Sequence, residues 1–219
     1  MPHKKFTKDI GLIGLTNLAI AVRILIALPI ITKVLGTKSF GIWTQITVAV
    51  SLLVPLINLG LPFSLVRFLA SETDKKKIRD GVYSVLAINF LISFITGVLI
   101  TAFSKPLSNF VGCEQNLIIM LAFIVIFECL NLVFLNTFRA FQQIKRYSFF
   151  LLFQTFGEII LTIIAILSGY GLFGAIFSLL LIRILNFLLT SFIVIKEIGF
   201  NLPRFASTKE YLAFGIPTV

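Results

Sequence analysis

Six long apolar runs, separated by short polar or charged segments, occupy most of this chain. They cover about residues 10–32, 41–66, 81–103, 117–138, 148–168 and 171–195. Each run holds about 20 residues or more, which is the length that an α-helix needs to cross the ~30 Å hydrocarbon core of a bilayer. The pattern therefore predicts an all-α, polytopic transmembrane helix bundle with six spanning helices.

Each run also carries small or polar residues at helical spacing, so that they share one face of the predicted helix. In chain order these stripes are Thr16, Ala19, Arg23 and Ala27; Thr44, Thr47, Ser51, Pro55 and Asn58; Asn89, Ser93 and Thr96; Glu128, Asn131 and Arg139; Gln154 and Glu158; and Arg183, Asn186 and Thr190. One such stripe is ordinary packing between membrane helices. Six of them favour a polar interior that the helices share.

Four charged residues fall near the middle of the predicted membrane. At a rise of ~1.5 Å per residue, Arg23, Glu128, Glu158 and Arg183 lie ~15–20 Å inside their runs. Intramembrane charge usually marks a functional site, but two arginines and two glutamates also suffice for two buried ion pairs. Both interpretations stay open. The candidate substrate-binding residues are Arg23, Arg183, Glu128, Glu158, Asn131 and Asn58.

Composition agrees with a membrane protein, and charge sets its orientation. Of the 219 residues, 58% are hydrophobic and 13% charged, and the mean hydropathy is +1.05. The net charge of +10 comes from segments between the runs, so nucleic acid binding is not implied. With the N-terminus in the cytoplasm, fourteen Lys and Arg lie inside and only Lys33, Lys38 and Lys105 outside. The sequence predicts this orientation in the cytoplasmic membrane.

The chain offers little for catalysis, metal binding or disulfide formation. His3 is the single histidine, and Cys113 and Cys129 are predicted to lie too far apart to be bridged. No Gly-rich phosphate loop, HExxH or GxSxG motif occurs, so neither an enzyme nor a cofactor is predicted. The first run is too long for a signal peptide and carries a mid-run arginine, which favours a retained first helix.

Two charged segments and the chain end complete the predicted organisation. Residues 71–80 read as a solvated juxtamembrane loop, with a specific anionic-lipid site as the sharper alternative. Residues 1–195 form the predicted transmembrane lobe, and 196–210 a cytoplasmic linker. Residues 211–219 read as the truncated start of a seventh helix, or else as a short interfacial segment.

Two local patterns carry a family resemblance. One is Leu35-Gly36-Thr37-Lys38-Ser39-Phe40-Gly41, and the other is Asn58-Leu59-Gly60-Leu61 followed by Arg67-Phe68-Leu69-Ala70. With the basic N-terminus and Arg23, they make the chain resemble the N-terminal lobe of a Wzx-type oligosaccharide flippase of the MATE-like superfamily. The resemblance implies two lobes around a central cavity, alternating access, and lipid-linked oligosaccharide as substrate. It also implies that Arg23, and less directly Arg183, meets the diphosphate or acidic sugars.

The resemblance further implies partners: membrane lipids, a glycan polymerase and other export components, and a second lobe or second chain. Two other functions remain open. A cation-coupled multidrug exporter of the same fold would use Glu128 and Glu158 as its ion site and leave Arg23 incidental. A non-transporting membrane scaffold is supported only by the short chain.

Overall fold

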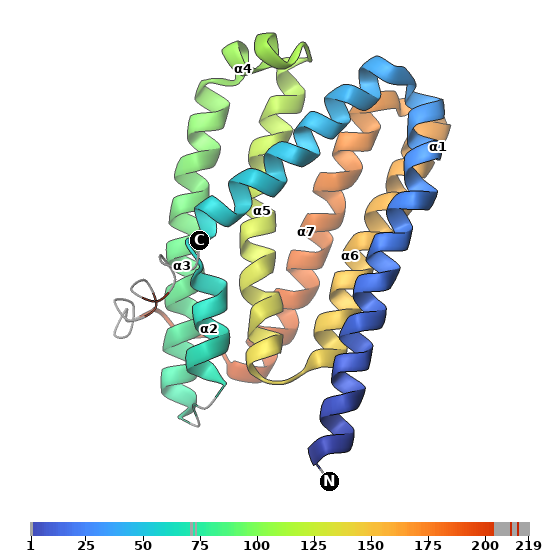
Figure 1. The fold of residues 1–219 in the computed structure, drawn as a ribbon. Coiled ribbons are helices and arrows are strands. Elements are labelled where there is room, and N and C mark those ends of the chain that lie inside the picture. Colours follow the sequence, from blue (N-terminus) through green and yellow to red (C-terminus); the bar gives the residue numbers. More distant parts are fainter. Residues whose placement is uncertain (1, 71, 73, 204–210, 212–213, 215–219) are drawn as a thin grey trace.

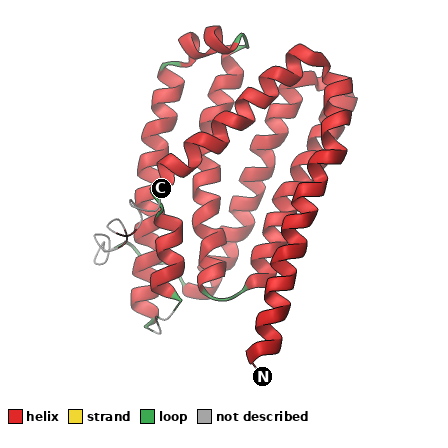
Figure 2. Cartoon of the chain, in the orientation of Figure 1, coloured by secondary structure: helices red, strands yellow, loops and turns green. Residues whose placement is uncertain are grey.

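The chain folds into a bundle of helices. The computed structural model describes residues 2–70, 72, 74–203, 211 and 214, with their side chains except those of 2–9 and 23–27. The elements are α1 (Pro2–Asn58), α2 (Leu61–Leu69), α3 (Lys75–Ala102), α4 (Ser104–Val111), α5 (Gln115–Ala140), α6 (Ile144–Ala165), a π-helical turn η1 (Ile166–Tyr170) and α7 (Gly171–Ile198). No strand occurs among these residues (Figure 2). The predicted all-α class is confirmed.

Helix α1 contains the first two predicted helices. It changes direction at Gly36, whose backbone (φ 75°, ψ 165°) is the one non-helical conformation inside it. A positive φ of this kind is open to glycine at little cost. Figure 1 shows α1 rising from the N-terminus and then turning over to cross the bundle obliquely. The residues flanking Gly36, which the sequence assigned to a loop, are instead helical.

The second predicted run, 41–66, is broken rather than continuous. Helix α1 ends at Asn58, Leu59 and Gly60 both have positive φ angles, and α2 then begins with Pro62 in its first turn. Proline suits this position because it has no N–H to leave unpaired there. The charged segment 71–80 also differs from its prediction as a loop. Its second half is the start of α3, where the Asp74 side chain accepts a hydrogen bond of 2.8 Å from the Lys76 backbone N–H.

Length and hydropathy identify four membrane-spanning stretches among the described residues: Leu28–Asn58, Lys75–Ala102, Gln115–Ala140 and Ile144–Ile198, with a shorter apolar helix at Ile10–Val22. The last stretch doubles back at Gly169 (φ 87°), so that it supplies both α6 and α7. With the two parts of α1, the described residues provide six long helical segments, as the sequence predicted.

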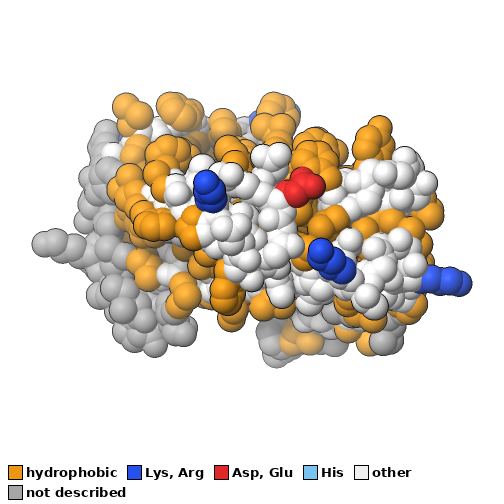
Figure 3. All heavy atoms as spheres, turned by 90° about the horizontal axis from the view of Figure 1, so that it is seen from above, with side chains coloured by type: hydrophobic (Ala, Val, Ile, Leu, Met, Phe, Trp, Pro, Cys, Tyr) orange, Lys and Arg blue, Asp and Glu red, His pale blue; other side chains and the backbone are white. Residues whose placement is uncertain are grey.

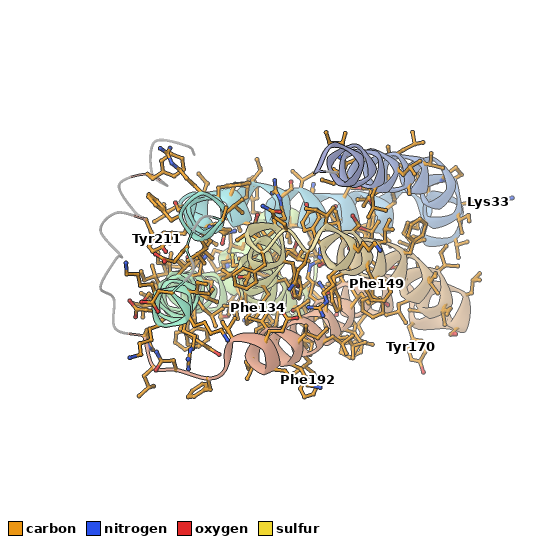
Figure 4. The ribbon with its side chains drawn as sticks, turned by 90° about the horizontal axis from the view of Figure 1, so that it is seen from below. Lys33, Phe134, Phe149, Tyr170, Phe192 and Tyr211 are labelled. Atoms are coloured by element: carbon orange, nitrogen blue, oxygen red, sulfur yellow. The ribbon has the colours of Figure 1, made fainter. Side chains whose placement is uncertain are left out.

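Helix α5 lies at the centre of the bundle and contacts every other numbered α-helix (Figure 1). Its buried residues join two large apolar clusters. Val133 and Phe138 pack with α2, α3 and α7, and Ile124 packs with the second part of α1 and α7. Most of the remaining large apolar side chains point outward, as expected for a surface that faces lipid. The side chain of Phe192 is 68% exposed and points away from the bundle in Figure 4.

The two ends of the bundle differ in charge. The N-terminus, the start of α3, the α5–α6 connection and the end of α7 lie at one end, and Gly36, α4 and η1 lie at the other (Figure 1). The second end carries few Lys and Arg side chains among many apolar ones (Figure 3). The helices therefore gather, at one end of the molecule, those basic segments of the orientation argument that lie among the described residues.

Candidate functional site

Six polar side chains from α5, α6 and α7 meet inside the bundle. Each helix supplies two: Glu128 and Asn131, Gln154 and Glu158, and Arg183 and Asn186. The members of each pair are three or four residues apart, so both side chains lie on the same face of their helix. Because the three helices pack against one another, these faces form one polar cluster inside an apolar bundle.

Arg183 is the centre of the cluster. Its Nε lies 2.9 Å from Glu128 Oε2, and its Nη1 lies 3.3 Å from Glu158 Oε2 and donates to the Leu179 carbonyl at 3.0 Å. The three charged side chains are 10%, 18% and 12% exposed. One arginine therefore contacts both glutamates, whereas the predicted alternative of two ion pairs gave one arginine to each.

Three amides extend the cluster. Gln154 Nε2 donates to Glu128 Oε2 at 2.7 Å, and Asn186 Nδ2 donates to Gln154 Oε1 at 2.8 Å. Asn131 Nδ2 donates to the Arg183 carbonyl at 2.9 Å. The cluster therefore runs without interruption from α5 through α6 to α7, and each helix is tied to the other two by polar contacts.

With every group ionised, the cluster carries a charge of −1, because two carboxylates surround one guanidinium. The Oδ1 atoms of Asn131 and Asn186 are buried and have no hydrogen-bond partner in the described structure. Buried amide oxygens of this kind, beside an excess carboxylate, suit a cation or a hydroxyl-bearing ligand. An anion would have to compete with a glutamate for Arg183.

The other two predicted site residues stand apart from this cluster. Asn58 is 4% exposed at the end of α1, and neither polar atom of its side chain has a partner in the described structure. No hydrogen bond or ion pair between described residues joins it to the cluster. Arg23 lies in α1, but its side chain is outside the described part of the chain.

Sequence reasoning missed two members of the cluster as site residues, Gln154 and Asn186. Both were visible on the predicted polar stripes, one turn from Glu158 and from Arg183 respectively. Some hydroxyls on the stripes of α1 and α3 are bonded within their own helix, whereas Thr44 and Asn89 on the same stripes have buried polar atoms without a partner in the described structure. Thr47 donates to the Trp43 carbonyl and Ser93 to the Phe90 carbonyl, so these hydroxyls are satisfied within their own helix.

The fold is that of one half of a MATE-like transporter of the MOP superfamily. The chain matches an outward-facing multidrug resistance MATE family transporter with 19% identity and a TM-score of 0.62, over 96% of this chain and 49% of that one. It matches a MOP superfamily transporter from Pyrococcus furiosus with 18% identity and a TM-score of 0.61, over 96% and 49%. At such identities the likeness concerns the fold, and the chain spans about half the length of these proteins.

A comparison with protein-family models identifies the family of the chain. Residues 6–219 match the family described as polysaccharide biosynthesis protein, and the chain belongs to that family. A search of curated proteins gave no significant match. The predicted resemblance to the Wzx-type group is therefore confirmed, and the protein is a multi-pass membrane protein.

Proposed function

We propose that this chain is the N-terminal lobe of a transporter that moves lipid-linked oligosaccharide units across the cytoplasmic membrane for surface polysaccharide synthesis. The observation that carries the proposal is the family match over residues 6–219. The fold, shared with one half of MATE-like transporters, supports transport rather than catalysis. The substrate is an undecaprenyl-diphosphate-linked repeat unit, and its headgroup passes from the cytoplasmic to the outer leaflet.

In this proposal Arg23 meets the diphosphate, because a guanidinium binds phosphate oxygens through two parallel hydrogen bonds. Arg183 contacts both Glu128 and Glu158 in this structure. During transport it releases one of these glutamates and either binds the anionic group of the substrate instead or changes its pairing between the two glutamates as the lobe moves. Asn131 offers an unpaired oxygen to sugar hydroxyls beside the cluster, and Asn58 offers an unpaired amide in α1.

The proposed transporting unit contains a second lobe, from the same chain or another. This chain covers 49% of the solved MATE transporter, whose remaining half has no counterpart in residues 1–219. The lobe lies with its N-terminus in the cytoplasm, because the described basic segments gather at that end. Strong labelling of Lys76→Cys by an impermeant thiol reagent in intact cells, in a chain whose Cys113 and Cys129 are replaced by alanine, would reverse this orientation.

The test of function is complementation of a strain that lacks its oligosaccharide flippase. A protein containing this lobe and its second lobe should restore surface polysaccharide, and residues 1–219 alone should not. If the two-lobe protein is well expressed and the strain still displays no surface polysaccharide, the proposed substrate is wrong. Restoration by monomeric 1–219 contradicts the need for a second lobe.

A second candidate function rests on the excess of acidic groups in the cluster. A cation-coupled multidrug exporter would use Glu128 and Glu158 to hold its ion, and the net charge of −1 favours a cation over an anion there. Such a protein should protect cells from cationic drugs. Glu128→Gln should remove that protection without changing polysaccharide display.

A further inference from the structure

An apolar groove lies on the bundle, and no residue of the polar cluster lines it. It has a volume of about 380 Å³ and is formed by α3, α5, α7 and the segment 200–203 that follows α7. Its walls include Leu86, Phe90, Phe127, Leu130, Phe187 and Leu202. Phe90, Phe200 and Leu202 are 49%, 70% and 72% exposed, so the groove opens on the outer surface of the bundle.

One end of the groove is held in shape by Tyr83. Its hydroxyl donates to the Gly199 carbonyl at 3.0 Å, and its ring packs edge-on against Phe200 at a centroid distance of 5.7 Å. These contacts fix the chain that leaves α7 against α3. The segment 200–203 is therefore positioned as a wall of the groove by specific contacts, and the groove does not depend on loose packing.

A cation lies at the same end. Arg79 is one turn before Tyr83 on α3, and its Nη1 lies 3.6 Å from the position that a Cβ at Gly199 would occupy. Its Nε is buried and has no hydrogen-bond partner in the described structure. The first turn of α3, with Lys75, Lys76 and Lys77, adds further positive charge at this end of the bundle.

We propose that this groove binds an anionic phospholipid, with one acyl chain against the aromatic walls and the phosphate of the headgroup at Arg79. The length of the groove fits one leaflet. Phe90 follows Tyr83 by seven residues on α3, which is ~10 Å along the helix. The hydrocarbon core of one leaflet is ~15 Å thick. The charge also fits, because basic side chains at the membrane surface attract acidic lipids.

A peptide segment suits the groove poorly. Only Tyr83 and Asn201 among the lining residues have polar side chains, and the Tyr83 hydroxyl is already engaged by Gly199. A backbone placed there would leave its own N–H and C=O groups without partners, which is costly away from water. A lipid chain has no such groups. The inference is independent of the substrate proposed above.

The test is lipid retention by the purified full chain, measured by native mass spectrometry after exchange into phosphatidylglycerol or phosphatidylcholine micelles. Wild type should retain phosphatidylglycerol in preference to phosphatidylcholine. Arg79→Gln should weaken retention roughly fivefold, because one surface cation contributes about that much to binding an acidic lipid. Arg79→Lys should keep most of the preference. Lys76→Gln, which removes the same charge from the same turn of α3, should have a smaller effect.

A second variant tests the groove itself. Ala87 lines it, and Ala87→Trp fills part of its volume while Arg79 stays in place. That variant should lose bound lipid of both kinds at an unchanged melting temperature. Equal retention by wild type and Arg79→Gln, or equal retention of the two lipids by wild type, would overturn the proposal. Displacement of the phospholipid by a polyprenyl phosphate at equal concentration would instead assign the groove to the transported lipid and also overturn it.

Discussion

Glu128 and Gln154 are joined across α5 and α6 by a hydrogen bond of 2.7 Å, and the carboxylate oxygen that accepts it also lies 2.9 Å from Arg183 Nε. One oxygen atom therefore links all three helices of the polar cluster. Any change in the charge of Glu128 alters the environment of both Gln154 and Arg183. This arrangement makes the cluster sensitive to a single substitution.

Removal of Arg183 should destabilise the protein strongly. Arg183→Met leaves two glutamates facing each other without a cation, and breaking a buried ion pair in this way costs about 3–5 kcal/mol. The expected result is a large drop in the amount of folded protein in the membrane, measured by fluorescence-detected size exclusion and by thermal melting.

The triple variant Arg183→Met, Glu128→Gln, Glu158→Gln is the matched control, since it removes all three charges. It should recover most of the lost stability, because neutral groups of similar size replace the uncompensated carboxylates. If the triple variant melted as low as Arg183→Met, the loss would come from packing rather than from unpaired charge.

Gly174 should not tolerate alanine. A Cβ at this position in α7 would lie 2.5 Å from Tyr170 Cβ and 3.1 Å from Ala165 Cβ, and neither atom is the end of a flexible side chain. Gly174→Ala should therefore separate α6 from α7 and lower stability by about 1–3 kcal/mol, as overpacking typically does. Thermal melting of the purified protein measures this effect.

The control for that substitution is Gly14→Ala in the first part of α1. No described atom lies within 4 Å of a Cβ placed there, and alanine favours the helix by up to about 1 kcal/mol over glycine. Gly14→Ala should melt at the wild-type temperature or slightly above it. Equal losses in the two variants would mean that the contact at Gly174 is not the cause.

The sequence was informative about the helices because each apolar run had to be long enough to cross the bilayer. It did not predict the break at Leu59 and Gly60. Asn58, Gly60 and Pro62 mark that point in the sequence, but residues 41–66 are apolar enough overall to be taken as one helix. The break itself is a backbone conformation with positive φ, which hydropathy does not report. Helix α4 was missed for a related reason, since Ser104–Val111 is short and lies between two long runs.

For the candidate site, spacing predicted which face of each helix was polar but not which faces would meet. Glu128 and Glu158 were identified from their spacing and depth, but the fact that both contact Arg183 depends on the rotation of α5, α6 and α7 about their axes. That rotation is set by packing, for example where Gly157 allows Ile182 of α7 to approach α6 closely. No local sequence signal carries it.

The predicted seventh helix at 211–219 falls mostly outside the described residues. Tyr211 and Phe214 are described, and both are helical. Ser64 of α2 donates to the Tyr211 carbonyl at 2.9 Å, and Arg67 lies 4.2 Å from the ring centroid of Phe214. In Figure 4 Tyr211 lies at the edge of the bundle near α2 and α3.

Cys113 should react with thiol reagents only at raised pH. It lies between α4 and α5, and its pKa is raised above the ordinary value of 9.0 first by burial and then by the neighbouring Glu114 carboxylate. Because the thiolate is the reactive form, labelling by a maleimide should be slow at neutral pH and should rise with pH toward a midpoint above the ordinary value of 9.0. Glu114→Gln should move the labelling curve toward lower pH.

The labelling is followed by mass in a protein carrying Cys129→Ala, so that Cys113 is the single thiol. Cys129 itself is fully buried in α5. Labelling with a midpoint below 9 would show that the positive end of α5 dominates over burial and Glu114. An unchanged curve in Glu114→Gln would remove the carboxylate as a cause.

Arg23 provides the sharpest test of transport. It lies ~20 Å inside the first apolar run, on the face shared with Thr16, and a diphosphate headgroup that crosses the membrane has to pass that depth. Arginine binds phosphate with two aligned donors, whereas lysine acts as a point charge. In the two-lobe protein, Arg23→Lys should retain part of the export activity, and Arg23→Ala should lower it by at least about tenfold at a normal protein level.

A structural role for Arg23 predicts a different pattern. If Arg23 were needed to neutralise Glu128 or Glu158, Arg23→Ala would lower the amount of folded protein, and Glu158→Gln in the same chain would restore it. Both glutamates already contact Arg183, so we expect no such rescue. The measurement is surface polysaccharide beside membrane protein level for Arg23→Ala, Arg23→Lys and the double variants. Normal export by well-expressed Arg23→Ala would remove Arg23 from the mechanism, because a binding group at the midplane cannot be lost without effect on the headgroup's passage.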